Sequence, residues 1–159
     1  MSLPKQALKD ELLAILSSDL LTLERAQLLA QQGATHEESK PENDKDTRAL
    51  EQSYLARGQA QRVLELRTQV AHVGGMPIRS FGPEDPIAVG ALVMIEDDEQ
   101  AQRVFLAPHG GGLVIGGGVV QVVTPASPLG RALLGKRFGE DCLVSVGERQ
   151  RELTVVAVE

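Results

Sequence analysis

Aromatic side chains are almost absent from this chain of 159 residues. It has three Phe, one Tyr and no Trp, so that aromatic residues make up only 3 % of the sequence. Pockets for small organic ligands are lined mainly by hydrophobic and aromatic side chains. The composition therefore argues against a pocket walled by aromatic rings.

Positive charge is also scarce. The sequence has 16 Lys and Arg against 22 Asp and Glu, which gives a formal net charge of −6 at pH 7. Direct binding to nucleic acid depends on clustered Lys and Arg that neutralise phosphates. The charge balance therefore argues against direct contact with nucleic acid and favours a protein or a metal ion as the partner.

Cysteine pairs and long apolar runs are missing too. Cys142 is the single cysteine, which rules out an intramolecular disulfide and fits a reducing compartment. No stretch approaches the ~18 apolar residues of a membrane span, and the N-terminus, MSLPKQALKDELL, does not have the pattern of a signal peptide. We therefore expect a soluble cytoplasmic protein with no membrane partner.

Two glycine-containing stretches resemble nucleotide-binding motifs only in part. Residues 130–136 fit the G-x-x-x-x-G-K frame of a phosphate-binding loop, but Arg137 stands where a Ser or Thr would hold Mg²⁺. The residues between those two glycines also favour helix. The glycine run at 110–118 lacks the G-x-G-x-x-G spacing and is typical of turns around a short strand. Neither stretch predicts a nucleotide site.

No arrangement of nucleophile and base is visible. The three histidines, His36, His72 and His109, lie far apart in the sequence and make no metal-ligand pair with Cys142. The cysteine lies in a strand pattern without a neighbouring base, and we interpret it as a buried apolar residue. We therefore expect no enzyme activity in the chain itself.

Residues 1–74 follow a helical pattern. Apolar residues recur at alternating steps of three and four on both sides of a polar stretch, which predicts an antiparallel coiled-coil hairpin. The two apolar stripes are Leu13, Leu16, Leu20 and Leu23, and then Leu50, Tyr54, Val63, Leu66, Val70 and Val73. Smaller residues near the polar turn predict a slim end of the hairpin: Ala26, Ala30, Ala34, Ala49 and Ala56.

Residues 75–159 follow a strand pattern after a break at residues 74–77, Gly-Gly-Met-Pro. Short β-branched stretches separated by Gly, Pro or acidic residues predict strands at 88–95, 102–107, 119–123, 142–146 and 152–158. A Ser-Pro pair opens a predicted short helix at 127–135. We expect a small antiparallel sheet with one helix, and hence an α+β fold with two domains, 1–74 and 75–159.

The polar turn of the hairpin, residues 37–46, holds five acids in the stretch EESKPENDKD. Most charged turns are simply solvated surface. Carboxylates are nevertheless the oxygen ligands that Mg²⁺ prefers, and Mg²⁺ commonly shares its ligands between a protein and another molecule. The turn is therefore a candidate for completing a metal site that belongs to another protein.

The C-terminal part of the sequence resembles the bacterial Gre transcript-cleavage factors. Residues 127–136, Ser-Pro-Leu-Gly-Arg-Ala-Leu-Leu-Gly-Lys, followed by Gly139 and an acid, are similar to the signature helix of that family. Phe81 with its following glycine, the strand at 89–95 and the final strand at 153–158 occur in the family's order. The resemblance implies an FKBP-like C-terminal domain, although the few aromatic residues do not favour prolyl-isomerase activity.

The resemblance also implies a function. Gre factors bind bacterial RNA polymerase and pass their coiled coil into its secondary channel, where acidic tip residues help to hold the catalytic Mg²⁺ while the polymerase cuts backtracked RNA. It implies that this chain is not itself an enzyme, contacts nucleic acid only through the transcription complex, and binds no Mg²⁺ stably alone. The implied catalytic residues are Glu42, Asn43 and Asp44, and the implied Mg²⁺ ligands are Glu38, Glu42, Asp44 and Asp46. We expect a monomer.

The tip differs from that of cleavage-competent relatives. Glu42 and Asn43 keep the family's Glu-Asn pair, but Ser39 stands where the family has its first metal-binding Asp. Two alternatives to a cleavage factor therefore stay open, namely a regulator of the channel that does not promote cleavage and a general coiled-coil interaction module. An inert, solvated turn is a third.

Overall fold

The computed structural model describes residues 3–37 and 45–159. By its internal contacts the chain divides into two compact units. The first, which we call the hairpin unit, is Ala14–Ala71, and the second, the sheet unit, joins the start of the chain through Leu13 to His72–Glu159. Among the described residues, no helix is both long and apolar enough to cross a membrane.

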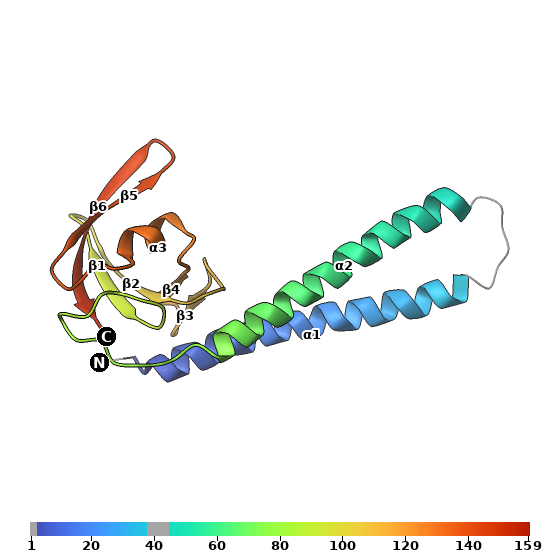
Figure 1. The fold of residues 1–159 in the computed structure, drawn as a ribbon, viewed down its shortest axis with the longest axis horizontal. Helices are drawn as coiled ribbons and strands as arrows, with labels where there is room; N and C mark the ends of the chain where they lie inside the picture. Colours follow the sequence, from blue (N-terminus) through green and yellow to red (C-terminus); the bar gives the residue numbers. More distant parts are fainter. Residues whose placement is uncertain (1–2, 38–44) are drawn as a thin grey trace. The chain divides into compact units, whose positions relative to one another are not determined.

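Two long helices account for the hairpin unit, and their ends belong to the sheet unit. α1 is Lys5–Glu37 and α2 is Lys45–Gly74, so both helices predicted from the apolar spacing are confirmed. Within the hairpin unit the two helices run in opposite directions (Figure 1). Their lengths follow from sequences that contain no internal proline, since a proline would break the backbone hydrogen bonding.

The helices contact each other through a few residues of the hairpin unit. Leu16 of α1 and Val63 and Leu66 of α2 are buried. Arg67 of α2 donates hydrogen bonds from Nε and Nη2 to Glu24 Oε1 of α1, at 3.1 and 3.0 Å. The packing of the hairpin unit is therefore concentrated where the sequence places its larger stripe residues.

The helices are not closely packed at their described ends, so the prediction of a slim end of the hairpin was wrong. The helices diverge as they approach Glu37 and Lys45 (Figure 1). Burial of a single methyl group contributes only about 0.8 kcal/mol, so alanines alone gain little by drawing two helices together. Among the described side chains, the exposed alanines of the predicted slim end are Ala26, Ala30, Ala49 and Ala56.

The sheet unit is built on six strands in the order β3-β4-β2-β1-β6-β5. The α+β fold class is confirmed. The strands are β1 (Leu92–Glu96), β2 (Ala101–Leu106), β3 (Val114–Ile115), β4 (Val120–Val123), β5 (Asp141–Val146) and β6 (Arg149–Val158), and α3 (Pro128–Leu133) lies between β4 and β5.

The sheet is mixed, whereas the sequence predicted an antiparallel one. β2 and β4 pair in parallel, with Phe105 opposite Val122, and the other four pairings are antiparallel. Parallel neighbours need a crossover of about a dozen residues or more. Residues 107–119, which include the glycine run and the two-residue strand β3, supply this crossover.

The first predicted strand begins later than expected. The sequence predicted a strand from residue 88, but β1 begins at Leu92 because the chain turns at Gly90. Gly90 has a φ of 97°, and a Cβ atom there would lie 2.7 Å from the carbonyl oxygen of Pro77. Only glycine fits this turn without strain.

Both faces of the sheet are covered inside the sheet unit. One face packs on α3, with Val104, Leu133 and Val155 in a single buried cluster. Phe105 points to the opposite face, since side chains alternate along a strand, and it is fully buried. On that face the Leu8 side chain of α1 lies against Gly116, beside Val120. The first turns of α1 therefore belong to the core of the sheet unit.

Candidate functional site

The predicted tip residues fall at the connection between α1 and α2. α1 ends at Glu37 and α2 begins at Lys45. The predicted residues Glu38, Glu42, Asn43 and Asp44 lie outside the described residues. Asp46 is in the first turn of α2, and its side chain also lies outside the description. Their role as Mg²⁺ ligands therefore stays a prediction.

The helices carry this connection far from the buried part of the hairpin unit. Leu16 is the last buried residue among the described side chains of α1, and the helix continues to Glu37. At 1.5 Å per residue, this stretch is about 30 Å long. The predicted acidic turn is thus connected to the packed part of the unit by two helical arms, residues 17–37 of α1 and 45–62 of α2.

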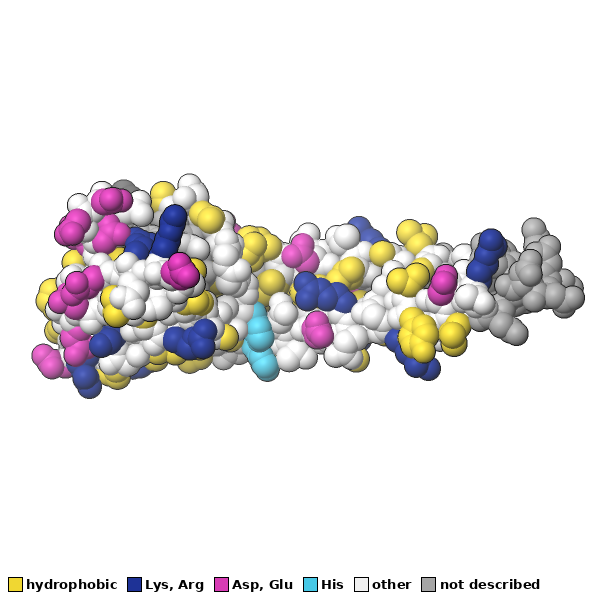
Figure 2. Space-filling model, turned by 90° about the horizontal axis from the view of Figure 1, so that it is seen from above, with side chains coloured by type: hydrophobic (Ala, Val, Ile, Leu, Met, Phe, Trp, Pro, Cys, Tyr) yellow, Lys and Arg dark blue, Asp and Glu magenta, His cyan; other side chains and the backbone are white. Residues whose placement is uncertain are grey.

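Exposed apolar side chains lie along these arms. Their exposed fractions range from 47 % for Leu21 to 68 % for Leu29 and Leu55. Figure 2 shows hydrophobic side chains on the surface of the arms, next to the residues that are not described. The sequence interpretation placed Leu50 and Tyr54 on a packed face, but both are exposed. Leu28 and Leu29 lie outside the apolar stripe predicted for α1. Their position in the sequence could therefore have indicated that they are exposed.

The motif at residues 127–136 forms a capped helix and no phosphate-binding loop. Ser127 is the N-cap of α3, and its Oγ accepts a hydrogen bond from Gly130 N–H at 3.0 Å and donates to the Thr124 carbonyl at 2.8 Å. A Cβ atom at Gly130 would overlap that carbonyl oxygen. Leu133 is fully buried, and Gly135, with a φ of 81°, ends the helix. The helical interpretation of this motif is confirmed.

The glycine run is also structural. A Cβ atom at Gly110, whose φ is 90°, would lie 2.6 Å from Leu12 Cδ1, and one at Gly116 would lie 2.9 Å from Leu8 Cδ2. Gly116 N–H donates to Glu11 Oε2 at 2.9 Å. The run lets the backbone approach α1 closely, and β3 within it confirms the predicted turns around a short strand.

Two of the three histidines come together, which the sequence interpretation missed. His72 Nδ1 and His109 Nε2 are 2.8 Å apart. Burial, followed by the charge of His72, lowers the pKa of His109 from its usual value of 6.5. The side chain of His36 is outside the description. The pair is separated by 37 residues, so local sequence spacing carried no signal for it.

The described residues contain no larger cluster of metal-binding side chains. Among them, no three His, Cys, Asp or Glu side chains gather closely enough to hold an ion. Cys142 is buried as predicted, and burial raises the pKa of its thiol.

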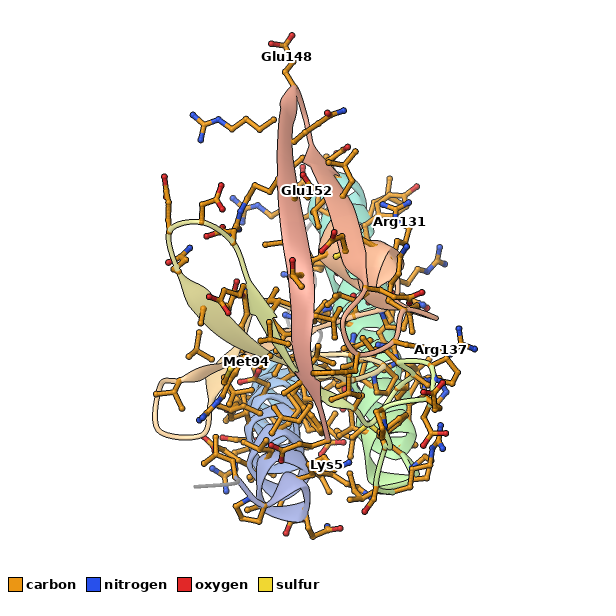
Figure 3. All side chains as sticks on the ribbon, turned by 90° about the vertical axis from the view of Figure 1, so that its left-hand side faces the viewer. Lys5, Met94, Arg131, Arg137, Glu148 and Glu152 are labelled. Carbon is orange, nitrogen blue, oxygen red and sulfur yellow. The ribbon has the colours of Figure 1, made fainter. Side chains whose placement is uncertain are left out.

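A shallow hollow of about 370 Å³ lies in the sheet unit beside Phe81. Lys5 Nζ is 5.0 Å and Arg79 Cζ 4.1 Å from the centre of the Phe81 ring. Phe81 is the one aromatic side chain lining this hollow. The view in Figure 3 places Lys5 near the end of β6.

The C-terminal part of the chain matches a protein-family model. Residues 82–159 match the family described as "Transcription elongation factor, GreA/GreB, C-term". This stretch contains α3 with its Ser-Pro-Leu-Gly cap, on which the predicted resemblance depended. The resemblance to the Gre family is confirmed. No curated protein matches the chain.

Several solved structures are similar to the chain at low identity. The crystal structure of GreA factor homolog 1 (Gfh1) of Thermus thermophilus has a TM-score of 0.40 at 20 % identity, covering 92 % of this chain and 94 % of that one. Gfh1 of Thermus aquaticus has a TM-score of 0.41 at 20 % identity, covering 91 % and 92 %. A GreA/GreB factor from Nitrosomonas europaea has a TM-score of 0.37 at 15 % identity, covering 71 % and 94 %.

Nothing about function follows from structural similarities of this size. The family model matches the sequence itself, over the whole of the sheet and α3. Residues 82–159 therefore form a C-terminal domain of the GreA/GreB family of transcription elongation factors.

Proposed function

We propose that this elongation factor binds bacterial RNA polymerase, inserts its helical hairpin into the secondary channel and stimulates cleavage of backtracked RNA. The observation that carries the proposal is the GreA/GreB match over residues 82–159. In the family that the sequence resembles, the C-terminal domain docks at the rim of the channel. In the cytoplasm, the sheet unit would bind the polymerase. The hairpin would then reach the polymerase active centre through the secondary channel.

The dimensions of the helices support this role. α1 has 33 residues and α2 has 30, which correspond to about 50 and 45 Å of helix. Helices of this length could carry a side chain to a distant centre. The residues that join them, 38–44, would be the part that advances furthest.

The chemistry of the tip residues supports a role at Mg²⁺. Carboxylate oxygens suit this hard cation, which usually keeps some waters and shares its ligands with a second molecule. At the polymerase active centre the Mg²⁺ stabilises charge on phosphate oxygens and activates water. Glu42 and one of Glu38, Asp44 or Asp46 would supply oxygen ligands, and Asn43 would hold them in position.

In this proposal the polymerase remains the enzyme. The ion belongs to its active centre, and the tip adds ligands in trans without binding Mg²⁺ stably by itself. Nucleic acid would be met only inside the transcription complex, and the chain would act as a monomer.

A second candidate function is regulation of the channel without stimulated cleavage. The observation that favours it is Ser39, which occupies the position of the family's first metal-binding Asp, with Lys40 and Lys45 nearby in the sequence. The two lysines lower the negative charge of the tip. Such a factor would occupy the channel and slow or retune the polymerase.

Cleavage of labelled RNA in a reconstituted, backtracked elongation complex distinguishes these functions. The full-length chain, Glu42→Ala and Asp44→Ala would be compared at equal occupancy of the polymerase, with Glu51→Ala as the control, since Glu51 is an exposed residue of α2 beyond the tip. We expect the chain to accelerate shortening of the RNA 3′ end, the two tip variants to lose this effect while still binding, and the control to keep it.

Ser39→Asp sharpens the test. If the tip holds Mg²⁺ with an incomplete ligand set, this substitution should raise the cleavage rate further. Unchanged or slower cleavage by the wild-type chain, together with competition against a cleavage-competent Gre factor, would support the regulator instead. Absence of any binding to polymerase would overturn both candidates.

A further inference from the structure

The two histidines of the sheet unit meet edge to edge. Their ring centres are 5.1 Å apart with 18° between the ring planes, and the facing nitrogens, His72 Nδ1 and His109 Nε2, are 2.8 Å apart. Because the nitrogens are much closer than the ring centres and the planes are nearly parallel, the nitrogens lie between the rings. This is the geometry of an N–H···N hydrogen bond.

Such a bond requires one proton between the two nitrogens. A neutral imidazole has one N–H donor and one acceptor nitrogen, whereas an imidazolium has two donors and no acceptor. The contact exists when both rings are neutral or when one is charged. Once both rings are charged, two donors and two positive charges face each other, and the bond is lost.

The pair joins two segments that are distant in sequence. His72 lies in the last turn of α2, next to Val73, which is fully buried. His109 lies in the segment after β2, next to Gly110, where the backbone approaches Leu12 of α1. The contact therefore links the end of α2 to the crossover segment of the sheet.

We propose that the His72–His109 contact is a proton-sensitive latch that holds the end of α2 to the segment following β2 and opens when both imidazoles are protonated. The opening would release residues 107–113 from α2 while Val73 and Phe105 keep the core closed, since both are fully buried. It is a local change inside the sheet unit and does not depend on the proposed function.

Charged side chains of α1 contact the segments next to the latch. On α1, which packs against the same segments, Lys9 donates to the carbonyl of Met76 at 2.9 Å and Glu11 accepts from Gly116 N–H. The pKa of His109 is lowered by burial first and by His72 second. A depressed histidine pKa favours the neutral ring in the folded protein.

The sign of the pH effect follows from that shift. Stability from the neutral ring is present above the ordinary histidine pKa of 6.5 and is lost as pH falls through the lower pKa of folded His109. The latch should therefore be closed at neutral pH and open in mildly acidic solution. Histidine is the side chain whose charge changes in this range.

A double-mutant cycle in the full-length chain tests the latch. His72→Gln, His109→Gln and the double variant would be unfolded with urea at pH 7.5 and at pH 5, with His36→Gln as a control outside the pair. A hydrogen bond of ordinary strength predicts a coupling of about fivefold in the unfolding constant at the higher pH. We expect a weaker coupling at the lower pH, and an unchanged pH dependence in His36→Gln.

Side-chain NMR gives an independent readout. The titration midpoint of His109 should lie below 6.5 in the wild-type chain and rise in His72→Gln, because the second charge is removed while burial remains. Amides of residues 107–113 should exchange faster at pH 5 in the wild type than in His109→Gln measured at the same pH. Independent titration of the two rings, or the same coupling at both pH values, would overturn the proposal.

Discussion

The sheet unit encloses its apolar side chains, whereas much of the hairpin unit leaves them in contact with solvent. Phe105 and Val155 of the sheet unit are fully buried, and Leu29 and Leu55 of the helical arms are each 68 % exposed. Burial of apolar area is the main favourable contribution to folding. The difference teaches that the fold is stabilised mainly by the sheet unit, and that exposed leucines on the arms are available to a partner.

The largest contrast is expected between a buried and an exposed apolar residue. Phe105→Ala should lower the free energy of unfolding by about 3–5 kcal/mol, because a fully buried aromatic side chain is replaced by a cavity. Leu29→Ala removes a side chain that is 68 % exposed and should cost less than about 0.5 kcal/mol. Urea unfolding followed by circular dichroism measures both. Equal losses would remove the distinction between the units.

A smaller loss in the free energy of unfolding is expected at Gly130 in the first turn of α3. In Gly130→Ala the added methyl group meets the Thr124 carbonyl, whose carbon would be 2.7 Å away, and backbone at this point must move. Overpacking of this kind costs about 1–3 kcal/mol, occasionally more. Urea unfolding measures the loss in the free energy of unfolding. Binding to RNA polymerase should weaken in parallel if α3 positions the surface that docks on the polymerase. A stability unchanged from wild type would contradict the described turn.

The same substitution in the hairpin unit should have the opposite sign. Gly58 lies within α2, and a Cβ atom there would meet nothing within 4 Å. Gly58→Ala should stabilise the helix by about 0.5–1 kcal/mol, because alanine loses less backbone entropy than glycine. Hydrogen exchange of the α2 amides would show slower exchange. Destabilisation would mean that the arm is packed against something at this position.

The smallest effect is expected at the ion pair between α1 and α2. Arg67 and Glu24 are joined at 3.0 Å, but the side chains are 57 % and 34 % exposed. An exposed pair contributes about 0.2–1 kcal/mol and weakens as salt is added. A double-mutant cycle with Arg67→Ala and Glu24→Ala at low and high salt measures it. A coupling that does not change with salt would show that the contact is not electrostatic.

Much of the fold was predictable because local sequence patterns decided it. Apolar steps of three and four fixed the two long helices, and the Ser-Pro pair at Ser127 predicted the cap of α3. The same ten residues, 127–136, carried the resemblance to the Gre family, and the family match now includes them.

What could not be predicted depends on contacts between distant residues. The parallel pairing of β2 with β4 is set by a crossover whose only strand, β3, has two residues. Exposure of Tyr54 depends on whether a facing helix comes close, which the periodicity of one helix does not reveal. The meeting of His72 and His109 depends on how α2 ends against the sheet.

The most direct test of the proposed function asks where the tip lies in the complex with RNA polymerase. Fe²⁺ substituted for the catalytic Mg²⁺ generates hydroxyl radicals that cut only polypeptide close to the ion, and excess Mg²⁺ should suppress the cutting. The account predicts that the full-length chain is cut within residues 37–46 and not within 75–159. Cuts in the sheet unit, or none in the hairpin of a polymerase-bound chain, would contradict it.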